Sequence, residues 1–410
     1  MKNKSRVHIN TNYLTYKEIF KSLFIKINSK KFLLKLKNFL KVKNLILTSQ
    51  GRVAIYILVK SLISNDKKNF ITSPYTLTEA LNAVKYAGGK LIFVDIDPST
   101  GLPNESQLKK KINSRTAGII ITHLTSNEKS IQNFLKKFKK YNVIEDTAIN
   151  FGASLNSKKL GTLTDFGIYS FGTMKNLCLI NGGLLYVKDK KIFDKCLNIS
   201  KRLKPYPKLE FLKKTLLALI IDIVYNKTIY NLLSHYMLGF VNKFNIRVIK
   251  KIIYPGLYPK FESNIPSTYQ YKFYDGVSQL GEKLIKNLEN QKKRRVKLIK
   301  IYEKNLKNLN ELKLFSFKRY STNSFLEYPI GLKKINDKKN LVIFLFKNGF
   351  DVREKWYVDN SKFKIFKNMN NNINARFLEE TILCLPLNPN FSENEIIYLC
   401  SLIKRYFQKN

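Results

Sequence analysis

Residues 165–187 read DFGIYSFGTMKNLCLINGGLLYV, a stretch in which two apolar, strand-like runs flank a polar turn. The runs cover residues 166–171 and 184–187, and Lys175 lies between them, beyond the end of the first run. A lysine beyond a strand end can form a Schiff base with a carbonyl compound once its pKa is lowered. In a chain this rich in lysine, an ordinary surface lysine is the alternative.

Strands and helices alternate over the region from about residue 48 to residue 189. Apolar runs predict strands, and amphipathic stretches between them predict helices. We expect strands at residues 70–73, 91–96, 117–123 and 142–144, and helices up to residue 86 and over 130–140. This alternation predicts an α/β fold with a mainly parallel sheet and helices on both faces, in which ligands bind at the carboxyl ends of the strands.

Two further features lie at that edge of the predicted sheet. Glu145 and Asp146 end the strand at 142–144, where a carboxylate can hold a cation, a metal or a protonated ring nitrogen. A helix cap or a solvated turn is the alternative. Residues 48–52 (TSQGR) directly precede the helical pattern VAIYILVKSLI. Small residues at a helix N-terminus expose amide groups that suit a phosphate, although an ordinary capped turn can look the same.

Residues 190–262 are both basic and apolar and differ from what precedes them. Their longest uncharged run, residues 228–242, has 15 residues, fewer than the roughly 18–20 that a membrane-spanning helix needs. Three interpretations stay open: a helical insertion buried within the protein, a helix on a membrane face or a partner, and a true span.

The remainder predicts a smaller α/β domain. We expect a long charged helix over about 269–309, a strand at 326–330, a helix at 339–348, a break at Gly349 and a last helix at about 393–407. Ser392 and Glu395 have the spacing of a capping box at the start of that last helix. The asparagine run at 368–374 predicts a loop.

The formal net charge is +45, from 74 Lys and Arg against 29 Asp and Glu. An anionic partner or the codon bias of an AT-rich genome explains such an excess, and no nucleic-acid-binding signature accompanies it.

Hydrophobic residues make up 44% of the chain, which excludes wholesale disorder. Four cysteines without CxxC spacing and three scattered histidines predict no metal site. Reduced thiols and no apolar leader predict a cytoplasmic protein.

Five stretches together resemble the DegT-type (DegT/DnrJ/StrS) sugar aminotransferases, which are fold-type I pyridoxal-phosphate enzymes. They are SQGRVAIYILVK, FITSPYTLTEALNAVKYAGGKLIFVDIDPSTGLP, VIEDTAINFGA, DFGIYSFGTMKNLCLINGGLLYV and ARFLEETILCLPLNPNFSENEI. The resemblance spans roughly residues 30–190 and 265–405. It implies a mainly parallel, seven-stranded type of sheet with helices on both faces and a smaller C-terminal α/β domain.

The resemblance assigns roles residue by residue. Lys175 is expected to hold pyridoxal 5'-phosphate covalently and to serve as the catalytic base. Asp146 is expected to pair with the pyridine nitrogen, and Ser170 with the turn at Gly51 and Arg52 to hold the phosphate. A bound carboxylate keeps that nitrogen protonated, so the ring accepts electrons.

Two positions depart from the family pattern. Ile149 stands where relatives have a glutamine that contacts the cofactor oxygen, and Asn150, next to it, is expected to point elsewhere. Leu77 stands where relatives often stack an aromatic ring on the cofactor, with Tyr75 as a candidate substitute. Both changes bear on cofactor affinity.

Other residues of the resemblance concern the substrate. Arg353 and Trp356 are candidate substrate contacts, with packing as the alternative. Tyr271 lies in a segment, residues 269–275, that relatives lend across a dimer. His123 is expected to be a structural residue at a strand end or a residue of the cleft. Because relatives that act as dehydratases carry histidine in place of the lysine, Lys175 favours transamination.

The expected function is therefore transfer of an amino group, with glutamate as donor, to a nucleotide-linked keto sugar for surface polysaccharide or O-antigen synthesis, by a homodimer that binds no nucleic acid. The alternative is a non-catalytic or altered scaffold of the same family in a membrane glycan-assembly complex. A peripheral contact with the inner membrane face through residues 205–260 is a further expectation. The expected organisation is an N-terminal segment (1–30), a cofactor-binding domain (31–190), the insertion (191–262) and the long helix with the small domain (263–410).

Overall fold

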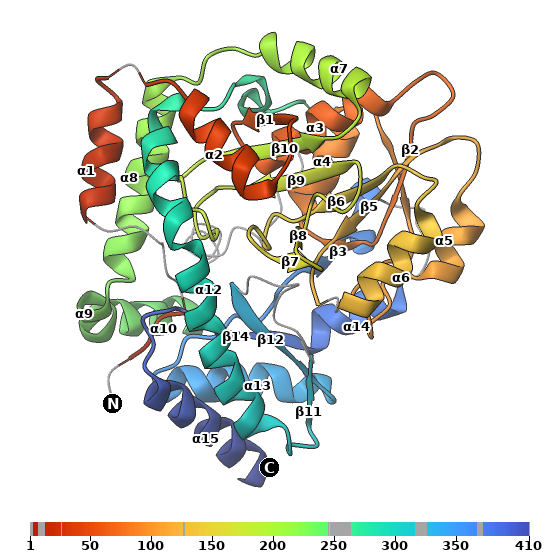
Figure 1. Cartoon of the computed structure of the whole chain (residues 1–410). Coiled ribbons are helices and arrows are strands. Elements are labelled where there is room, and N and C mark those ends of the chain that lie inside the picture. Colours follow the sequence, from red (N-terminus) through yellow and green to blue (C-terminus); the bar gives the residue numbers. More distant parts are fainter. Residues whose placement is uncertain are drawn as a thin grey trace.

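The computed structural model describes residues 3–6, 13–25, 27–125, 128–244, 246, 264–315, 326–366 and 372–409 (Figure 1). Its largest element is a seven-stranded sheet in the order β1-β10-β9-β6-β5-β2-β4. The strands are β1 (Leu45–Thr48), β2 (Asn69–Thr72), β4 (Lys90–Phe93), β5 (Thr116–Thr122), β6 (Val143–Asp146), β9 (Phe166–Ser170) and β10 (Gly183–Val187). Strand β10 runs opposite to the other six strands of this sheet, which are parallel to one another, so the predicted mainly parallel α/β sheet is confirmed.

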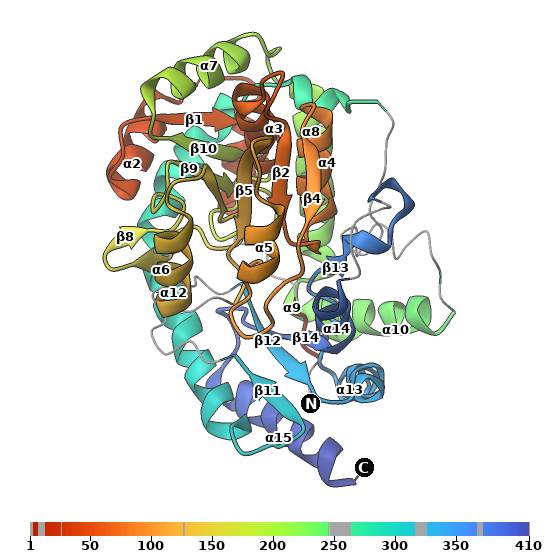
Figure 2. The same ribbon diagram turned by 90° about the vertical axis from the view of Figure 1, so that its right-hand side faces the viewer.

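Helices cover both faces of this sheet, because its central strands carry apolar side chains on both sides. On β5, Ile120 packs into the core beneath α3 (Gly51–Leu62), α4 (Thr78–Tyr86) and α7 (Lys190–Lys201). Its neighbours Ile119 and Ile121 pack instead with α5 (Glu105–Lys111) and α6 (Glu128–Phe138). Figure 2 shows α3 and α4 on one side of the sheet and α6 on the other.

The long helix α12 (Ser278–Leu306) connects the large sheet to a smaller one (Figures 1 and 2). Near its start it packs with α1 (Tyr13–Ser22), α2 (Lys30–Leu40) and the strands β9 and β10. The smaller sheet is antiparallel in the order β11-β12-β14 (Leu312–Leu314, Glu327–Leu332, Ile382–Pro386) and carries α13 (Ile335–Lys347), α14 (Ile373–Thr381) and α15 (Glu393–Lys409). The Tyr302 hydroxyl on α12 donates to the Pro386 carbonyl, 2.9 Å away, and joins helix and sheet.

A second link joins the two sheets close to the cleft between them. The short strands β3 (Tyr75–Thr76) and β13 (Val358–Asp359) pair antiparallel, although nearly 300 residues separate them in the chain. The Asn360 amide donates to the Pro74 and Thr76 carbonyls at 2.8 Å each. These contacts fix the segment that follows α13 against the carboxyl edge of the large sheet. Strands β7 (Ser154–Leu155) and β8 (Lys158–Lys159) pair with each other as a separate antiparallel hairpin.

Some sequence-based boundaries were wrong. The long helix begins at Ser278, not near residue 269, because two 3₁₀ turns (Ser267–Gln270 and Asp275–Val277) precede it. Helix α14 begins inside the asparagine run that predicts a loop; residues 367–371 lie outside the described part. The Glu395 amide donates to the Ser392 hydroxyl and the Ser392 amide to the Glu395 carboxylate, so the capping box is confirmed.

The insertion forms a bent helical segment along one side of the molecule (Figure 1). It consists of α8 (Lys208–Val224), α9 (Lys227–Ile229), a π-helical turn (Tyr230–Ser234) and α10 (His235–Lys243). Many of its apolar side chains are exposed, including Leu209, Ile220, Leu232 and Phe240, so it is not an insertion buried within the chain. Among the described residues no single helix is long and apolar enough to cross a bilayer. Two helical segments, Lys208–Val224 and Lys227–Val241, are long and apolar enough only when they are taken together, and the chain bends by 53° between them.

Candidate active site

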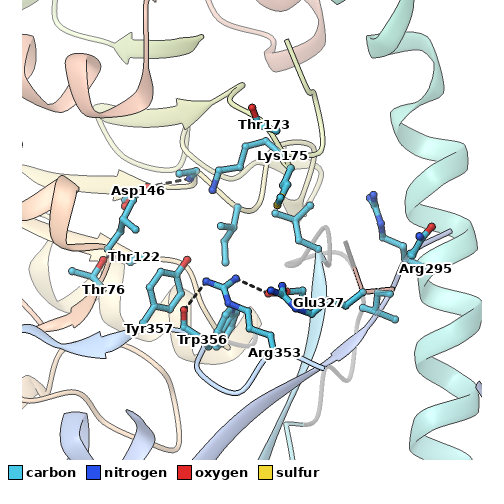
Figure 3. Close-up of a pocket in the computed structure, with 18 of the residues that line it drawn as sticks. Thr76, Thr122, Asp146, Thr173, Lys175, Arg295, Glu327, Arg353, Trp356 and Tyr357 are labelled. Carbon is cyan, nitrogen blue, oxygen red and sulfur yellow. Dashed lines mark hydrogen bonds and ion pairs between the residues drawn. The ribbon is translucent and has the colours of Figure 1, made fainter. Parts of the chain in front are cut away.

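A pocket opens at the carboxyl edge of the large sheet, where the smaller sheet and α12 approach it (Figure 3). The large sheet supplies Thr122 and Asp146 from strand ends and Thr173, Met174 and Lys175 from the turn after β9. The C-terminal part supplies Glu327, Arg353, Trp356 and Tyr357, the N-terminal segment Arg6, and α12 Arg295. The pocket therefore lies where a mainly parallel sheet is expected to bind its ligand.

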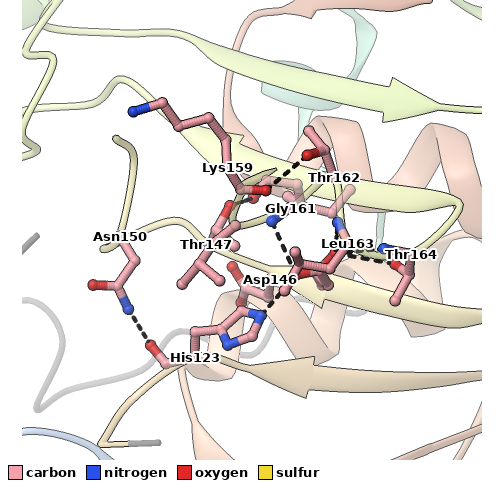
Figure 4. Close-up of polar contacts among 12 residues, drawn as sticks. His123, Asp146, Thr147, Asn150, Lys159, Gly161, Thr162, Leu163 and Thr164 are labelled. Atoms are coloured by element: carbon pink, nitrogen blue, oxygen red, sulfur yellow. Dashed lines mark hydrogen bonds and ion pairs between the residues drawn. The ribbon is translucent and has the colours of Figure 1, made fainter. Parts of the chain in front are cut away.

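Asp146 faces this pocket, whereas Glu145 points to the other side of β6, since successive strand residues alternate in direction. Figure 4 shows Asp146 together with His123 and the loop residues Gly161, Leu163 and Thr164. The Glu145 carboxylate is fully buried and accepts hydrogen bonds from three backbone amides, those of Gly161, Leu163 and Thr164, at 2.8–2.9 Å. His123 Nε2 donates to it from 2.9 Å, because a carboxylate offers only acceptors. Glu145 and His123 therefore hold the loop after β8, and His123 is not a wall residue of the pocket.

The turn that carries Lys175 has an unusual backbone. Met174, the residue before it, has φ +65°, in the left-handed region that non-glycine residues rarely adopt. Such a conformation costs on the order of 1–3 kcal/mol and persists where the surroundings impose it. Here the Lys175 amide donates to the Gly172 carbonyl at 3.2 Å, and Asn176 after it is buried. The tight turn presents the Lys175 side chain to the pocket.

Burial and charge act in opposite directions on the Lys175 and Asp146 side chains. Loss of water around the ammonium lowers the pKa of Lys175, while the Asp146 carboxylate counters this shift. Burial likewise raises the pKa of Asp146, against the Ala148 amide, which donates from 3.0 Å, and the charge of Lys175. A lowered lysine pKa increases the fraction of the neutral, nucleophilic amine.

Of the three predicted phosphate-binding residues, Gly51 and Ser170 lie in contact, and none of the three is in the pocket wall. A Cβ atom on Gly51, the first residue of α3, would lie 3.1 Å from Ser170 Cβ and 3.2 Å from the Tyr169 carbonyl oxygen. A side chain at position 51 would therefore require the end of β9 to move by a few tenths of an ångström. The Arg52 guanidinium donates to the Gln50 side chain and lies 5.9 Å from the centre of the Tyr269 ring, so it is turned away from Ser170.

Of the two residues considered for the ring-stacking position, only Leu77 lines the pocket. Tyr75 is buried in the core, where its ring packs edge-on against Tyr357 at 5.9 Å. Tyr75 therefore does not substitute for the missing aromatic ring. Ile149 lines the pocket with an apolar surface, and Asn150 points away as expected, donating to the His123 carbonyl at 2.6 Å.

Arg353 and Trp356 both line the pocket, so the structure brings these two candidates to the predicted site. Arg353 donates to the Glu327 carboxylate at 2.8 Å and to the Trp356 carbonyl at 3.1 Å. Arg6 approaches the same Glu327 at 3.4 Å. Tyr271, in contrast, packs on Tyr206 at 5.3 Å between ring centres and does not line this chain's pocket.

Sequence reasoning missed several wall residues. Thr122 ends β5 directly before His123, and the same strand-end argument that selected Asp146 would have selected it. Arg295 is in phase with the buried positions Leu288, Ile299 and Tyr302 of α12, a periodicity that marks it as inward-facing. Arg6 and Glu327 lie far apart in the chain, and no local pattern connects them.

The sequence profile of the DegT/DnrJ/EryC1/StrS aminotransferase family matches residues 20–207 and 246–404. The matched ranges leave out residues 208–245, which contain α8 to α10. A GDP-perosamine synthase of Escherichia coli O157:H7 is 32% identical over 152 residues, which is 37% of this chain. The match spans only 42% of that relative's length. An uncharacterised protein of Methanocaldococcus jannaschii is 24% identical over 91% of this chain and 88% of its own.

Solved structures share the fold over the full length. The aminotransferase PseC of Helicobacter pylori, involved in the biosynthesis of pseudoaminic acid, superposes with a TM-score of 0.75 at 16% identity, covering 100% of both chains. The GDP-4-keto-6-deoxy-D-mannose-3-dehydratase of E. coli, solved with hydrated pyridoxal phosphate, gives 0.71 at 17% identity, over 98% of this chain and 99% of its own. At these identities the likeness concerns the fold.

Proposed function

The chain belongs to the DegT/DnrJ/EryC1/StrS aminotransferase family, and from this premise we propose that it is a transaminase that delivers an amino group to a keto sugar. Pyridoxal phosphate is the cofactor that membership of this family implies. One observation carries the proposal: the Lys175 amine and the Asp146 carboxylate face the same pocket at the carboxyl edge of the sheet.

The side chains at the pocket fit this cofactor. An aldehyde requires an amine that is neutral part of the time, and the pKa of Lys175 is lowered by burial. A pyridine nitrogen requires a carboxylate, which Asp146 offers, and a phosphate suits the amides at the start of α3 beside Ser170. Leu77 and Ile149 offer apolar contacts to a flat ring.

Bound pyridoxal phosphate supplies an electron sink that stabilises negative charge on the neighbouring carbon of the substrate. Asp146, desolvated in the pocket wall, would hold the ring nitrogen in its protonated form, and that positive charge would favour the ionised carboxylate. The Lys175 amine would be the group that takes a proton from the substrate carbon and returns one, because it faces the pocket and burial lowers its pKa.

The keto sugar is proposed to be nucleotide-linked and the amino donor to be glutamate. The name of the GDP-perosamine synthase relative, and the cationic side chains of Arg6, Arg353 and Arg295 in the pocket wall, support a substrate with anionic groups. Synthesis of surface polysaccharide or O-antigen is the proposed context.

A homodimer is proposed because residues 269–275 match the segment that relatives lend across a dimer. Sedimentation of the purified protein measures its mass.

Incubation of the purified protein with pyridoxal phosphate, glutamate and a panel of nucleotide-linked keto sugars, followed by mass spectrometry, tests the activity. We expect one sugar of the panel to exchange its keto oxygen for an amino group. Lys175→Ala is expected to lose both the visible absorbance of the bound cofactor and amino transfer. Full transamination by Lys175→Ala, or a colourless protein that binds no cofactor, would contradict this proposal. Either result would favour the alternative, a non-catalytic or altered scaffold of the same family.

We further propose that the exposed apolar stripe of α8 to α10 contacts an anionic membrane surface. Leu209, Ile220, Leu232, Tyr236, Met237 and Phe240 are each more than half exposed along it. Exposed lysines flank the stripe, Lys208 and Lys213 at its start and Lys243 at its end, whereas Glu210 and Asp222 are only partly exposed. Apolar side chains bordered by lysines suit the boundary between acyl chains and anionic headgroups.

Co-sedimentation with vesicles of phosphatidylglycerol and phosphatidylcholine tests this contact. We expect binding that falls with salt, is weak to pure phosphatidylcholine and is lost in a Leu232→Ser, Met237→Ser variant. Ile397→Ser, which removes an exposed apolar side chain of α15, is the matched control. If the double variant instead changes the oligomeric state, or if vesicles never bind the protein, the stripe does not contact a membrane.

A further inference from the structure

Arg295 is a buried cation in the wall of the pocket. Its side chain projects from the middle of α12 and is 3% exposed. Nη1 donates to the Asn176 side-chain oxygen at 3.0 Å, and within the described part of the chain Nε has no hydrogen-bond partner. Burial lowers the pKa of Arg295 to about 10, so the guanidinium is still charged at neutral pH. A buried charge with one neutral partner is a costly arrangement.

The arginines near Arg295 have carboxylate partners. Arg353 pairs with Glu327 at 2.8 Å, and Arg6 lies 3.4 Å from Glu327 and 3.5 Å from Asp351. Arg294, the preceding residue, faces Glu393 and donates to the Phe391 carbonyl at 2.7 Å. Among the described residues no carboxylate lies within ion-pair distance of Arg295. A guanidinium fork with free donors is the geometry that binds carboxylate and phosphate oxygens in pairs.

The position of Arg295 relates this unpaired charge to the reaction. It lines the same pocket as Lys175 and, in Figure 3, projects from α12 on the far side of the pocket from Asp146. We propose that Arg295 binds an anionic oxygen group of a substrate held in this pocket, and thereby sets which substrates enter it. The group is the carboxylate of the amino donor or a phosphate of the nucleotide-linked sugar. This inference rests on the proposed transamination.

A purely structural role is the competing explanation. Asn176, the partner of Arg295, directly follows Lys175, so Arg295 also steadies the turn that carries the lysine. A side chain that only steadies the turn would affect every reaction of Lys175 equally. One that binds a substrate anion would affect only the half-reaction in which that anion takes part.

The two half-reactions of a transaminase can be measured separately on the holoenzyme. Loss of the visible cofactor absorbance on addition of glutamate reports the first, and its recovery on addition of the nucleotide-linked keto sugar reports the second. We would compare the wild type with Arg295→Met, with Arg295→Lys, and with Arg405→Met. The last removes one exposed guanidinium from a distant helix, where it donates to the Asn348 side chain and lies over the Phe344 ring. Thermal stabilisation by glutarate, a dicarboxylate that has no amine to transfer, measures anion binding without turnover.

Arg295→Met is expected to raise the concentration needed for half-saturation in one of the two half-reactions by about tenfold to a hundredfold, the worth of a charged hydrogen bond. Arg295→Lys is expected to restore part of that loss, and Arg405→Met to behave as wild type. If the glutamate half-reaction and the effect of glutarate are lost, the anion is the donor carboxylate. If only the sugar half-reaction is weakened, it is the phosphate.

An equal loss in both half-reactions, or no loss in either, would overturn the role of Arg295 in anion binding. These outcomes differ from failure of the proposed function. In that case the wild-type protein would show no cofactor absorbance and neither half-reaction, whatever stands at position 295.

Discussion

Glu145 and Asp146 are neighbours in the chain, yet the fold gives their carboxylates opposite tasks. Five donor groups surround the Glu145 carboxylate: the amides of Gly161, Leu163 and Thr164, the Thr164 hydroxyl and His123 Nε2. Asp146 accepts from the Ala148 amide and otherwise faces the pocket. The first carboxylate therefore serves stability and the second is available for a ligand.

Glu145→Gln is expected to destabilise the protein by about 2–4 kcal/mol, because the amide group of glutamine would point its own donors at donors that are already buried. Asp146→Asn is expected to change stability by less than about 1 kcal/mol, since burial already disfavours the charged form. Urea unfolding of the cofactor-free proteins measures both. Equal effects of the two substitutions would contradict the division of tasks.

Gly51 offers a second comparison at the scale of one residue. Gly51→Ala is expected to weaken cofactor binding about tenfold, or about 1.4 kcal/mol, because the added Cβ crowds Ser170 at 3.1 Å and separates α3 from β9. Gly331→Ala, in the smaller sheet, is the control, since its Cβ would meet its nearest atom, Lys313 Cβ, at 3.4 Å. Titration with pyridoxal phosphate measures the dissociation constants. Equal constants for the two variants would refute the phosphate assignment.

The residues of this site differ in how well the sequence predicts them. Lys175 and Asp146 follow strands whose apolar runs are visible in the sequence, and strand-end geometry then places them in one pocket. Glu327 and Arg6 meet only through the packing of the smaller sheet, which no local pattern encodes. Tyr75 was a plausible ring contact by sequence distance, but the alternation of its short strand turns it into the core.

At the scale of elements, the insertion combines two features. Helix α8 exposes Ile220 and Ile223 on its outer face, while Lys214 turns inward toward Asn181, at 3.4 Å from its side-chain oxygen. Burial, with the charge of Arg52 as the second cause, lowers the pKa of Lys214 to about 8. Since the family profile passes over residues 208–245, this lysine belongs to a segment that the common fold does not require.

The lowered pKa predicts how Lys214 affects stability as pH changes. Below pH 8 the ammonium is charged in both the folded and the unfolded chain, and its burial costs stability in full. Between pH 8 and about 10.5 the folded protein holds fewer protons than the unfolded chain, so this cost disappears as pH rises. Lys214→Met is therefore expected to be more stable than wild type at pH 7 by roughly 1–2 kcal/mol.

The difference between the two proteins should shrink toward pH 10. Urea unfolding of both at pH 7, 8.5 and 10 measures it, and the comparison cancels the contribution of the other lysines. A difference that stays constant over this range would show that the ammonium of Lys214 is not desolvated in the fold.

At the scale of the whole molecule, the alternation of strands and helices was enough to predict a mainly parallel sheet with helices on both faces, but neither strand β1 nor the strand order. Boundaries failed where tertiary contacts override local preference. Helix α14 begins within an asparagine run because the Asp95 carboxylate, at the end of β4, accepts from the amides of Asn374 and Ala375 at 2.9 Å. Such a cap from 280 residues away cannot be read from a local pattern.

The net charge of +45 is also a property of the whole molecule. Most basic side chains lie on the surface, and the pocket uses few of them. The basic side chains in the pocket wall are Lys175, Arg6, Arg295 and Arg353, while the exposed lysines beside the apolar stripe concern the proposed membrane contact.

The most direct test of the central claim is to identify the lysine that carries the cofactor. The protein loaded with pyridoxal phosphate is reduced with borohydride, digested and mapped by peptide mass spectrometry. We predict that the cofactor mass is found on the peptide that contains Lys175, among the 74 lysines and arginines of the chain, and nowhere else. A cofactor attached to another lysine, or spread over many, would contradict the account of this site.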